Sequence, residues 1–168
     1  MRMIDPLLME FDRENSTTKK VLERVPAEKA EWAPHAKSMS LGKLATHIAT
    51  LPGWIGGALL GDGFDMASGK GGVPPTPATT AELVALFEKN ADVAKQAMSQ
   101  LDDEKAMGLW TFSVAGKTIF AMPRIALVRS ILLNHGYHHR GQLSVYLRLL
   151  DVPVPSIYGP SADENPFA

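Results

Sequence analysis

The chain has 168 residues, of which 45% are hydrophobic and 21% are charged, and its formal net charge is −1. This composition is typical of a globular protein, and the near-neutral charge with no basic run argues against a nucleic-acid partner. The absence of cysteine excludes disulfides, thiolate metal ligands and a cysteine nucleophile. No stretch approaches the roughly 18 consecutive apolar residues of a membrane span, and the first residues lack the pattern of a signal peptide, so we expect a soluble, cytoplasmic protein.

The first helix is predicted to begin at Asp5, as the N-cap with Pro6 at the first helical position, and to end at Pro26. Its apolar residues recur at helical spacing. Three acidic side chains are expected on the solvated face: Glu10, Asp12 and Glu14. Two polar residues share the apolar stripe and lie either inside the bundle or at its wet edge: Asn15 and Thr18.

A connection over residues 26–38 leads to a second helix, predicted from Ser40, its N-cap, to about Leu60. His47 falls on the apolar face of this helix, where a single histidine is more often a hydrogen-bonded core residue than a metal ligand. Pro52 is expected to kink the helix one turn later, and the glycines that follow are expected to weaken and end it. His35, in the preceding loop, is expected to be exposed.

Residues 61–79 are rich in Gly, Pro and Ser and predict a long surface loop, with a lid over a site as the sharper alternative. Residues 69–72 within it lack the spacing of a phosphate-binding loop. A third helix, running to about Gln100, is predicted to begin with a capping box formed by Thr79 and Glu82. Residues 102–104 then form an acidic turn that we expect to be solvated.

Residues 110–120 alternate around Ala115 and Gly116, which predicts a short hairpin or an extended connection. Pro123 then opens a fourth helix that runs to about Leu150, and the apolar, proline-rich tail is expected to lie along the surface. Four helical segments with long connecting loops predict an all-α four-helix bundle in a single domain, residues 1–168.

The fourth helix carries the strongest functional signal. His135 and His139 are four residues apart, so both lie on one face of the helix, on the apolar stripe, and can share one metal ion. An inward histidine on a facing helix would complete a three-nitrogen site, and His47 is the candidate. Three protein ligands with open positions are typical of catalytic metal sites. Gly136 stands where a zinc protease of the His-Glu-x-x-His type has its general base, which excludes that class.

The neighbours of these histidines have different expected roles. His138 lies about 100° around the helix from His139 and cannot easily share the same ion, so we expect it at the flank of the site or at a subunit contact. Gln142 is close to the stripe and is a candidate to hydrogen-bond a ligand or a bound water. Arg140 is expected to form a surface or interface ion pair.

Residues 138–148, with His135 before them, resemble the signature helix of the DinB-like (DinB/YfiT-like) metal-binding proteins. Residues 40–49 are similar to the second-helix motif of that family, and residues 32–34 and 152–155 are also similar to its members. The resemblance spans nearly the whole chain. It implies a four-helix bundle, a frequent homodimer, and a divalent ion, zinc or nickel, held by His47, His135 and His139.

The wider superfamily includes S-transferases that use a low-molecular-weight thiol, so the resemblance implies a metal-dependent enzyme acting on a small-molecule substrate. Without a protein cysteine, the thiol would come from a cofactor, and transfer of that thiol or hydrolysis would both fit. The alternative is a non-catalytic, metal-stabilised bundle that acts as a binding module in a stress response. A coordination sphere open to solvent favours the enzyme, and a fourth protein ligand favours the structural role.

Overall fold

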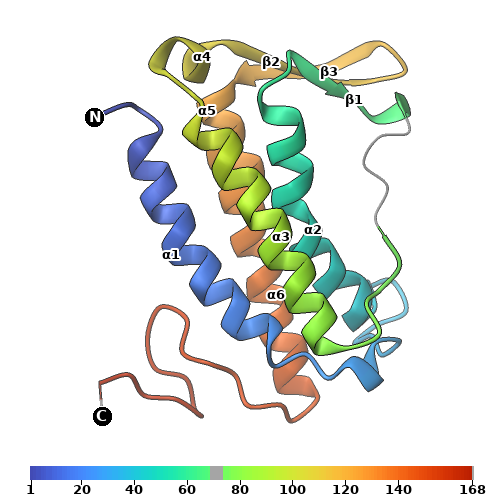
Figure 1. Cartoon of the computed structure of the whole chain (residues 1–168). Helices are drawn as coiled ribbons and strands as arrows, with labels where there is room; N and C mark the ends of the chain where they lie inside the picture. The colour runs from blue at the N-terminus through green and yellow to red at the C-terminus, as the bar shows by residue number, and fades with distance from the viewer. Residues whose placement is uncertain (69–73, 168) are drawn as a thin grey trace.

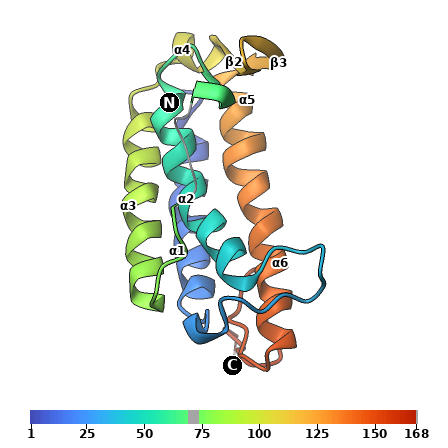
Figure 2. The ribbon, with the colours of Figure 1, turned by 90° about the vertical axis from the view of Figure 1, so that its right-hand side faces the viewer.

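The computed structural model describes residues 1–68 and 74–167 (Figure 1). Long helices lie side by side around a shared core (Figures 1 and 2): α1 (Asp5–Leu22), α2 (Leu41–Leu59), α3 (Thr80–Ser99) and α6 (His135–Leu149). α6 continues a rod that begins with α5 (Arg124–Leu127) and passes through η3 (Val128–Asn134), a π-helix. Shorter helical segments also occur: η1 (Ala27–Lys29), η2 (Met66–Ser68) and α4 (Asp103–Met107).

The helix starts follow the predicted caps in two of three cases. The Ser40 hydroxyl accepts a hydrogen bond from the Lys43 N–H, and Thr79 and Glu82 form the complete capping box. The third prediction is wrong, because Ile4 is the N-cap of α1 and Asp5 lies in the first turn. The Asp5 carboxylate instead accepts the backbone N–H of Arg2 at 2.7 Å.

A small sheet lies across one end of the helices (Figures 1 and 2). β2 (Leu109–Val114) and β3 (Lys117–Pro123) form the predicted hairpin, and both turn residues, Ala115 and Gly116, have positive φ, as in a type I′ turn. β1 (Gly63–Asp65) adds a parallel strand beside β2, inside the segment expected to be a loop. The prediction of an all-α four-helix bundle is therefore confirmed only in its coarser part: the protein is mostly helical but carries a three-stranded sheet.

The sheet is fastened to the end of α2 by two side chains. The indole N–H of the fully buried Trp110 donates to the carbonyl of Ala58 at 3.0 Å. The guanidinium of Arg124 donates to two carbonyls: that of Leu59, the last residue of α2, and that of Gly61, two residues further along the chain. A cation at these carbonyls satisfies acceptors that have no partner within the helix and complements its dipole. The helix and the hairpin thus form one packed end of the molecule.

α2 ends at Leu59, close to the predicted end at about Leu60, and Gly61 follows directly after its C-cap, but two of the glycines expected to weaken the helix lie within it: Gly56 and Gly57. Gly56 lies inside it against α3, where an added Cβ would stand 2.6 Å from the Cα of Ala94. This contact lets α2 and α3 approach closely, and they make the most extensive helix contact of the fold. The helix also continues past Pro52. No helix within residues 1–68 and 74–167 has the length and apolarity that a membrane span requires.

The acidic residues 102–104 are exposed, as predicted, and two of them also accept hydrogen bonds from the backbone. Asp102 caps the short helix α4, and the Asp103 carboxylate accepts the backbone N–H of Met3 at 2.7 Å. The predicted surface course of the tail is confirmed, because Val152, Val154 and Ile157 pack against the core. Residues 69–72, predicted not to form a phosphate-binding loop, lie outside the described residues.

Candidate metal centre

The structure brings three histidines together from helices that are far apart in the sequence. The Nε2 atoms of His47 on α2 and His135 on α6 are 3.2 Å apart, and those of His135 and His139 are 2.6 Å apart. All three offer a ring nitrogen within 4.8 Å of the others, a spacing that suits a metal ion. The spacing of four residues places the rings of His135 and His139 on one face of α6, and the inward face of α2 supplies the third ring.

The surroundings of these rings favour neutral imidazole. Burial, reinforced by the neighbouring imidazoles, lowers the pKa of His135 to about 4. Burial is also the main cause that lowers the pKa of His47 and of His139. A histidine must be neutral to bind a metal through its ring nitrogen, so the folded chain presents the three rings in the form that a metal needs.

Gln142 orients one of the three rings. Its side-chain oxygen lies 2.7 Å from Nδ1 of His139, one turn earlier on α6. An N–H at Nδ1 donates to this oxygen, which leaves Nε2 of His139 with a free lone pair directed at the other two rings. The prediction that Gln142 hydrogen-bonds a member of the site is confirmed.

The π-helix η3 ends immediately before His135. A π-helical turn holds more residues than an α-helical turn, so it shifts the side chains that follow relative to those that precede it. Here Leu132 and Leu133 are both buried in the core just before His135 turns towards α2. Such segments occur frequently at functional sites. The periodicity of the sequence predicted one regular helix and did not indicate this segment.

The remaining histidines lie outside the cluster. His138 is exposed at its flank, as predicted, with its ring edge-on to His139 at a centroid distance of 4.9 Å. His35 is exposed in the loop before α2, also as predicted, and its Nδ1 accepts the backbone N–H of Lys37. These positions leave His47, His135 and His139 as the histidines that converge.

Arg140 is not at the surface, contrary to the prediction. Its side chain is 2% exposed and pairs at 2.6 Å with Glu14 of α1, which is 8% exposed. Glu14 had been expected on the solvated face of its helix. Thr18 accepts a further hydrogen bond from the guanidinium, and the Tyr158 hydroxyl contacts both charged groups. The interior alternative for Thr18 is therefore correct, and α1, α6 and the tail meet at one buried ion pair.

A second cluster lies nearer the start of α1, where Glu10, one turn before Glu14, meets Arg129 of η3 and Tyr137 of α6. Glu10 accepts two hydrogen bonds from Arg129 and one from the Tyr137 hydroxyl, each between 2.7 and 2.8 Å. Hydrogen bonding to Arg129 is the main cause that lowers the pKa of Glu10. Burial, followed by the hydrogen bond to this carboxylate, raises the pKa of Tyr137. Both clusters fix α1 against the helix that carries His135 and His139.

The fold and the histidine cluster together define a class of protein. It is a mostly helical protein in which two helices direct three imidazoles at one point. The chain belongs to the DinB family, whose sequence model matches residues 2–166. The chain is also similar to uncharacterized protein YrdA of Bacillus subtilis (strain 168), with 25% identity over 163 residues, covering 96% of this chain and 91% of that protein.

Two crystal structures share the fold. A DinB-like protein from Bacillus cereus ATCC 10987 superposes with a TM-score of 0.71 and 23% identity, covering 90% of this chain and 95% of that one. The DinB-like protein YjoA of Bacillus subtilis gives a TM-score of 0.68 and 18% identity, covering 91% of this chain and 97% of that one. The similarity therefore extends over most of each chain.

Proposed function

We propose that the chain binds one divalent metal ion through His47, His135 and His139. The observation that carries this proposal is the approach of three ring nitrogens, with gaps of 3.2 and 2.6 Å between neighbouring Nε2 atoms. Metal–nitrogen bonds of about 2.0–2.1 Å place two nitrogens on one ion roughly 3 Å apart, close to these separations. Three neutral imidazoles suit zinc and nickel among the divalent ions, and the chain has no thiolate to compete for the ion.

The donor set supports an enzyme more than a purely structural site. Among residues 1–68 and 74–167, no fourth His, Asp or Glu joins the three histidines as a possible ligand. Three protein ligands leave a coordination position for another molecule, which is the pattern of catalytic sites. When bound, a divalent ion lowers the pKa of a coordinated thiol or water and makes a nucleophile available near neutral pH.

The residues of this chain then have distinct roles in the proposed reaction. The three imidazoles hold the ion, and Gln142 keeps Nε2 of His139 directed at it through the hydrogen bond to Nδ1. The nucleophile comes from outside the chain, because no cysteine is present. We propose transfer of a low-molecular-weight thiol to an electrophile as the reaction class, with hydrolysis by an activated water as the second candidate that the same open position supports.

The test uses cobalt, whose visible spectrum reports the ligands of the ion. Metal-free protein is titrated with Co²⁺, and we expect it to bind about one ion per chain. The visible absorption should have the intensity typical of cobalt with few ligands, most of them nitrogen. His139→Ala should abolish this stoichiometric binding. His138→Ala is the matched control, because it removes the adjacent, exposed histidine, and it should bind as the parent does. Equal binding by both variants contradicts the three-histidine site.

The same cobalt-loaded samples separate the enzyme from the non-catalytic, metal-stabilised bundle. Adding a small thiol should introduce a sulfur-to-metal charge-transfer band if a coordination position is open. A spectrum that does not change on addition of thiol or of a small anion contradicts the open site and favours the structural role. Thiol transfer to a panel of electrophiles, with and without a chelator, then tests the reaction class.

A further inference from the structure

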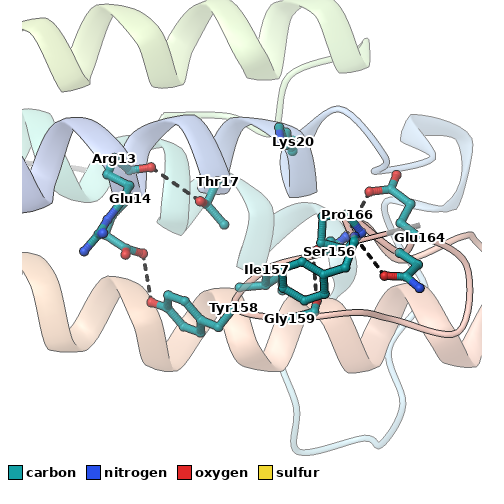
Figure 3. A pocket seen from close by; sticks show the side chains of 12 residues that line it. Arg13, Glu14, Thr17, Lys20, Ser156, Ile157, Tyr158, Gly159, Glu164 and Pro166 are labelled. Atoms are coloured by element: carbon teal, nitrogen blue, oxygen red, sulfur yellow. Dashed lines mark hydrogen bonds between the residues drawn. The ribbon is translucent and has the colours of Figure 1, made fainter.

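A second candidate site lies between α1 and the tail, and none of the three histidines lines it. It is a cavity of about 690 Å³, with one wall from α1 and the other from residues 156–167 (Figure 3). Cavities that hold small molecules measure roughly 300–1,000 Å³, so this one has the size of a ligand site.

Specific interactions hold both walls of the cavity in place. The Tyr158 hydroxyl, which points at α1 in Figure 3, donates to the Glu14 carboxylate at 2.8 Å. Further along the tail, Glu164 pairs with Arg24 just beyond α1 and also accepts the backbone N–H of Ser156. The tail is therefore fastened at both sides of the cavity, and the hollow between the fastenings is part of the fold.

The free charge in this cavity is positive. Both lining carboxylates are already engaged, Glu14 by Arg140 and Glu164 by Arg24. The two lining cations are Arg13 and Lys20, and neither side chain forms a hydrogen bond or an ion pair with any residue of 1–68 and 74–167. They lie seven residues apart on α1, which is about 10 Å along a helix, so both can act on one small ligand. This arrangement favours an anion.

The cavity also presents an aromatic face. The Tyr158 residue is 71% exposed although its hydroxyl is tied to the buried ion pair. One face of its ring is covered by the Arg140 guanidinium, at 5.1 Å from the ring centroid. Ile157 and Phe167 add apolar surface beside it. A flat apolar group can stack on such a ring, and this geometry gives aromatic contacts energy beyond the buried area alone.

We propose that this cavity binds a small organic anion with a flat apolar body. Its acidic group is held by Arg13 and Lys20, and its body lies against Tyr158, Ile157 and Phe167. Binding depends on the fold of α1 and the tail and is independent of any metal at the histidine cluster.

The probe for the test is 8-anilinonaphthalene-1-sulfonate, which combines one acidic group with flat rings. It is titrated into the full chain while backbone amide signals are followed by NMR. We expect saturable shifts at Thr17, Ile157 and Gly159, which line the cavity. The Arg13→Ala/Lys20→Ala variant should weaken binding by about ten-fold, corresponding to about 1.4 kcal/mol.

The matched control is Lys89→Ala/Lys117→Ala, which removes the same charge from exposed positions on α3 and the hairpin. It should leave the dissociation constant within about two-fold of the parent value. Shifts confined to other surfaces, or equal weakening by both double variants, overturn the proposal. Equal displacement of the probe by inorganic phosphate at the same concentration also overturns it, because the apolar body would then contribute nothing.

Discussion

At the scale of single residues, two arginine–glutamate pairs connect α1 to the helix of the histidine cluster, and they differ mainly in burial. Arg140 and Glu14 are 2% and 8% exposed, whereas Arg129 and Glu10 are 44% and 25% exposed. A charge left without its partner costs far more in the interior than in water. The two pairs therefore form a natural comparison within one protein.

We predict that Arg140→Met destabilises the protein by about 3–5 kcal/mol, because it leaves the Glu14 carboxylate buried without its cation. Arg129→Met should cost less than about 1 kcal/mol, because Glu10 keeps access to water. Urea unfolding followed by circular dichroism measures both values. Combining Glu14→Leu with Arg140→Met should recover most of the loss, since no unpaired charge then remains. Similar costs for the two single variants contradict this account.

The same residues show where reasoning from the sequence succeeded and where it failed. His135 and His139 could be found because their spacing of four fixes their common face, and His47 because its own helix has a clear apolar stripe. The burial of Glu14 and Arg140 could not be predicted, because a charged residue is buried only when an oppositely charged partner lies beside it. These two partners are 126 positions apart, and local periodicity contains no information about that pairing.

At the scale of elements, α2 carries two adjacent glycines with opposite surroundings. A Cβ at Gly56 would meet the backbone of Ala94 on α3 at 2.6 Å, whereas a Cβ at Gly57 would meet nothing within 4 Å. Both lie inside the helix, so both share the conformational disadvantage of glycine there. Only Gly56 is required by the packing of helix on helix.

We predict that Gly57→Ala stabilises the protein by up to about 1 kcal/mol, since alanine is the better helix former and the space is open. Gly56→Ala should destabilise it by about 1–3 kcal/mol, because α2 and α3 must move apart to admit the methyl group. Thermal and urea unfolding of the two variants provide the test. Stabilisation by both substitutions would show that the close contact of α2 with α3 is unimportant.

The elements themselves were predictable to different degrees. The capping box at Thr79 and the positive-φ turn at Ala115 and Gly116 are local signals, and both are present in the structure. Strand β1 is only three residues long and pairs with residues of β2 that lie 48 positions later in the chain, so nothing local marks it. Strand β1 was missed for the same reason as the buried ion pair: its partner is remote in the sequence.

At the scale of the whole molecule, the histidine cluster links stability to pH. Above about pH 6.5 these histidines are neutral in the folded and the unfolded chain alike, so they have no effect on stability. As the pH falls, the unfolded chain binds protons that the folded chain does not bind, because burial lowers the pKa of His135 to about 4. With respect to these histidines, the protein is therefore most stable above the pKa of the unfolded chain, and it loses stability progressively as the pH falls towards the pKa of the folded chain.

We predict that metal-free protein loses thermal stability between about pH 7 and pH 5. His135→Gln should reduce this loss, because it removes a group that must remain uncharged, whereas His35→Gln in the exposed loop should leave it unchanged. Melting temperatures measured by circular dichroism in the presence of a chelator supply the test. Adding Zn²⁺ at pH 7 should raise the melting temperature of the parent protein, as expected for a ligand that binds only the folded chain. An identical pH dependence in both variants contradicts the prediction.

The separation of His47 from His135 along the chain gives the proposed ion one more effect. These residues are 88 positions apart, so an ion bound to both closes a loop of that length. In the chain-entropy description of cross-links, closing such a loop lowers the conformational entropy of the unfolded state by an amount worth about 4.6 kcal/mol at 25 °C. A chain without cysteine cannot form a disulfide, yet this ion would tie its second and last long helices together as a disulfide does. Unlike a disulfide, the tie is insensitive to reductants and opens to chelators and acid.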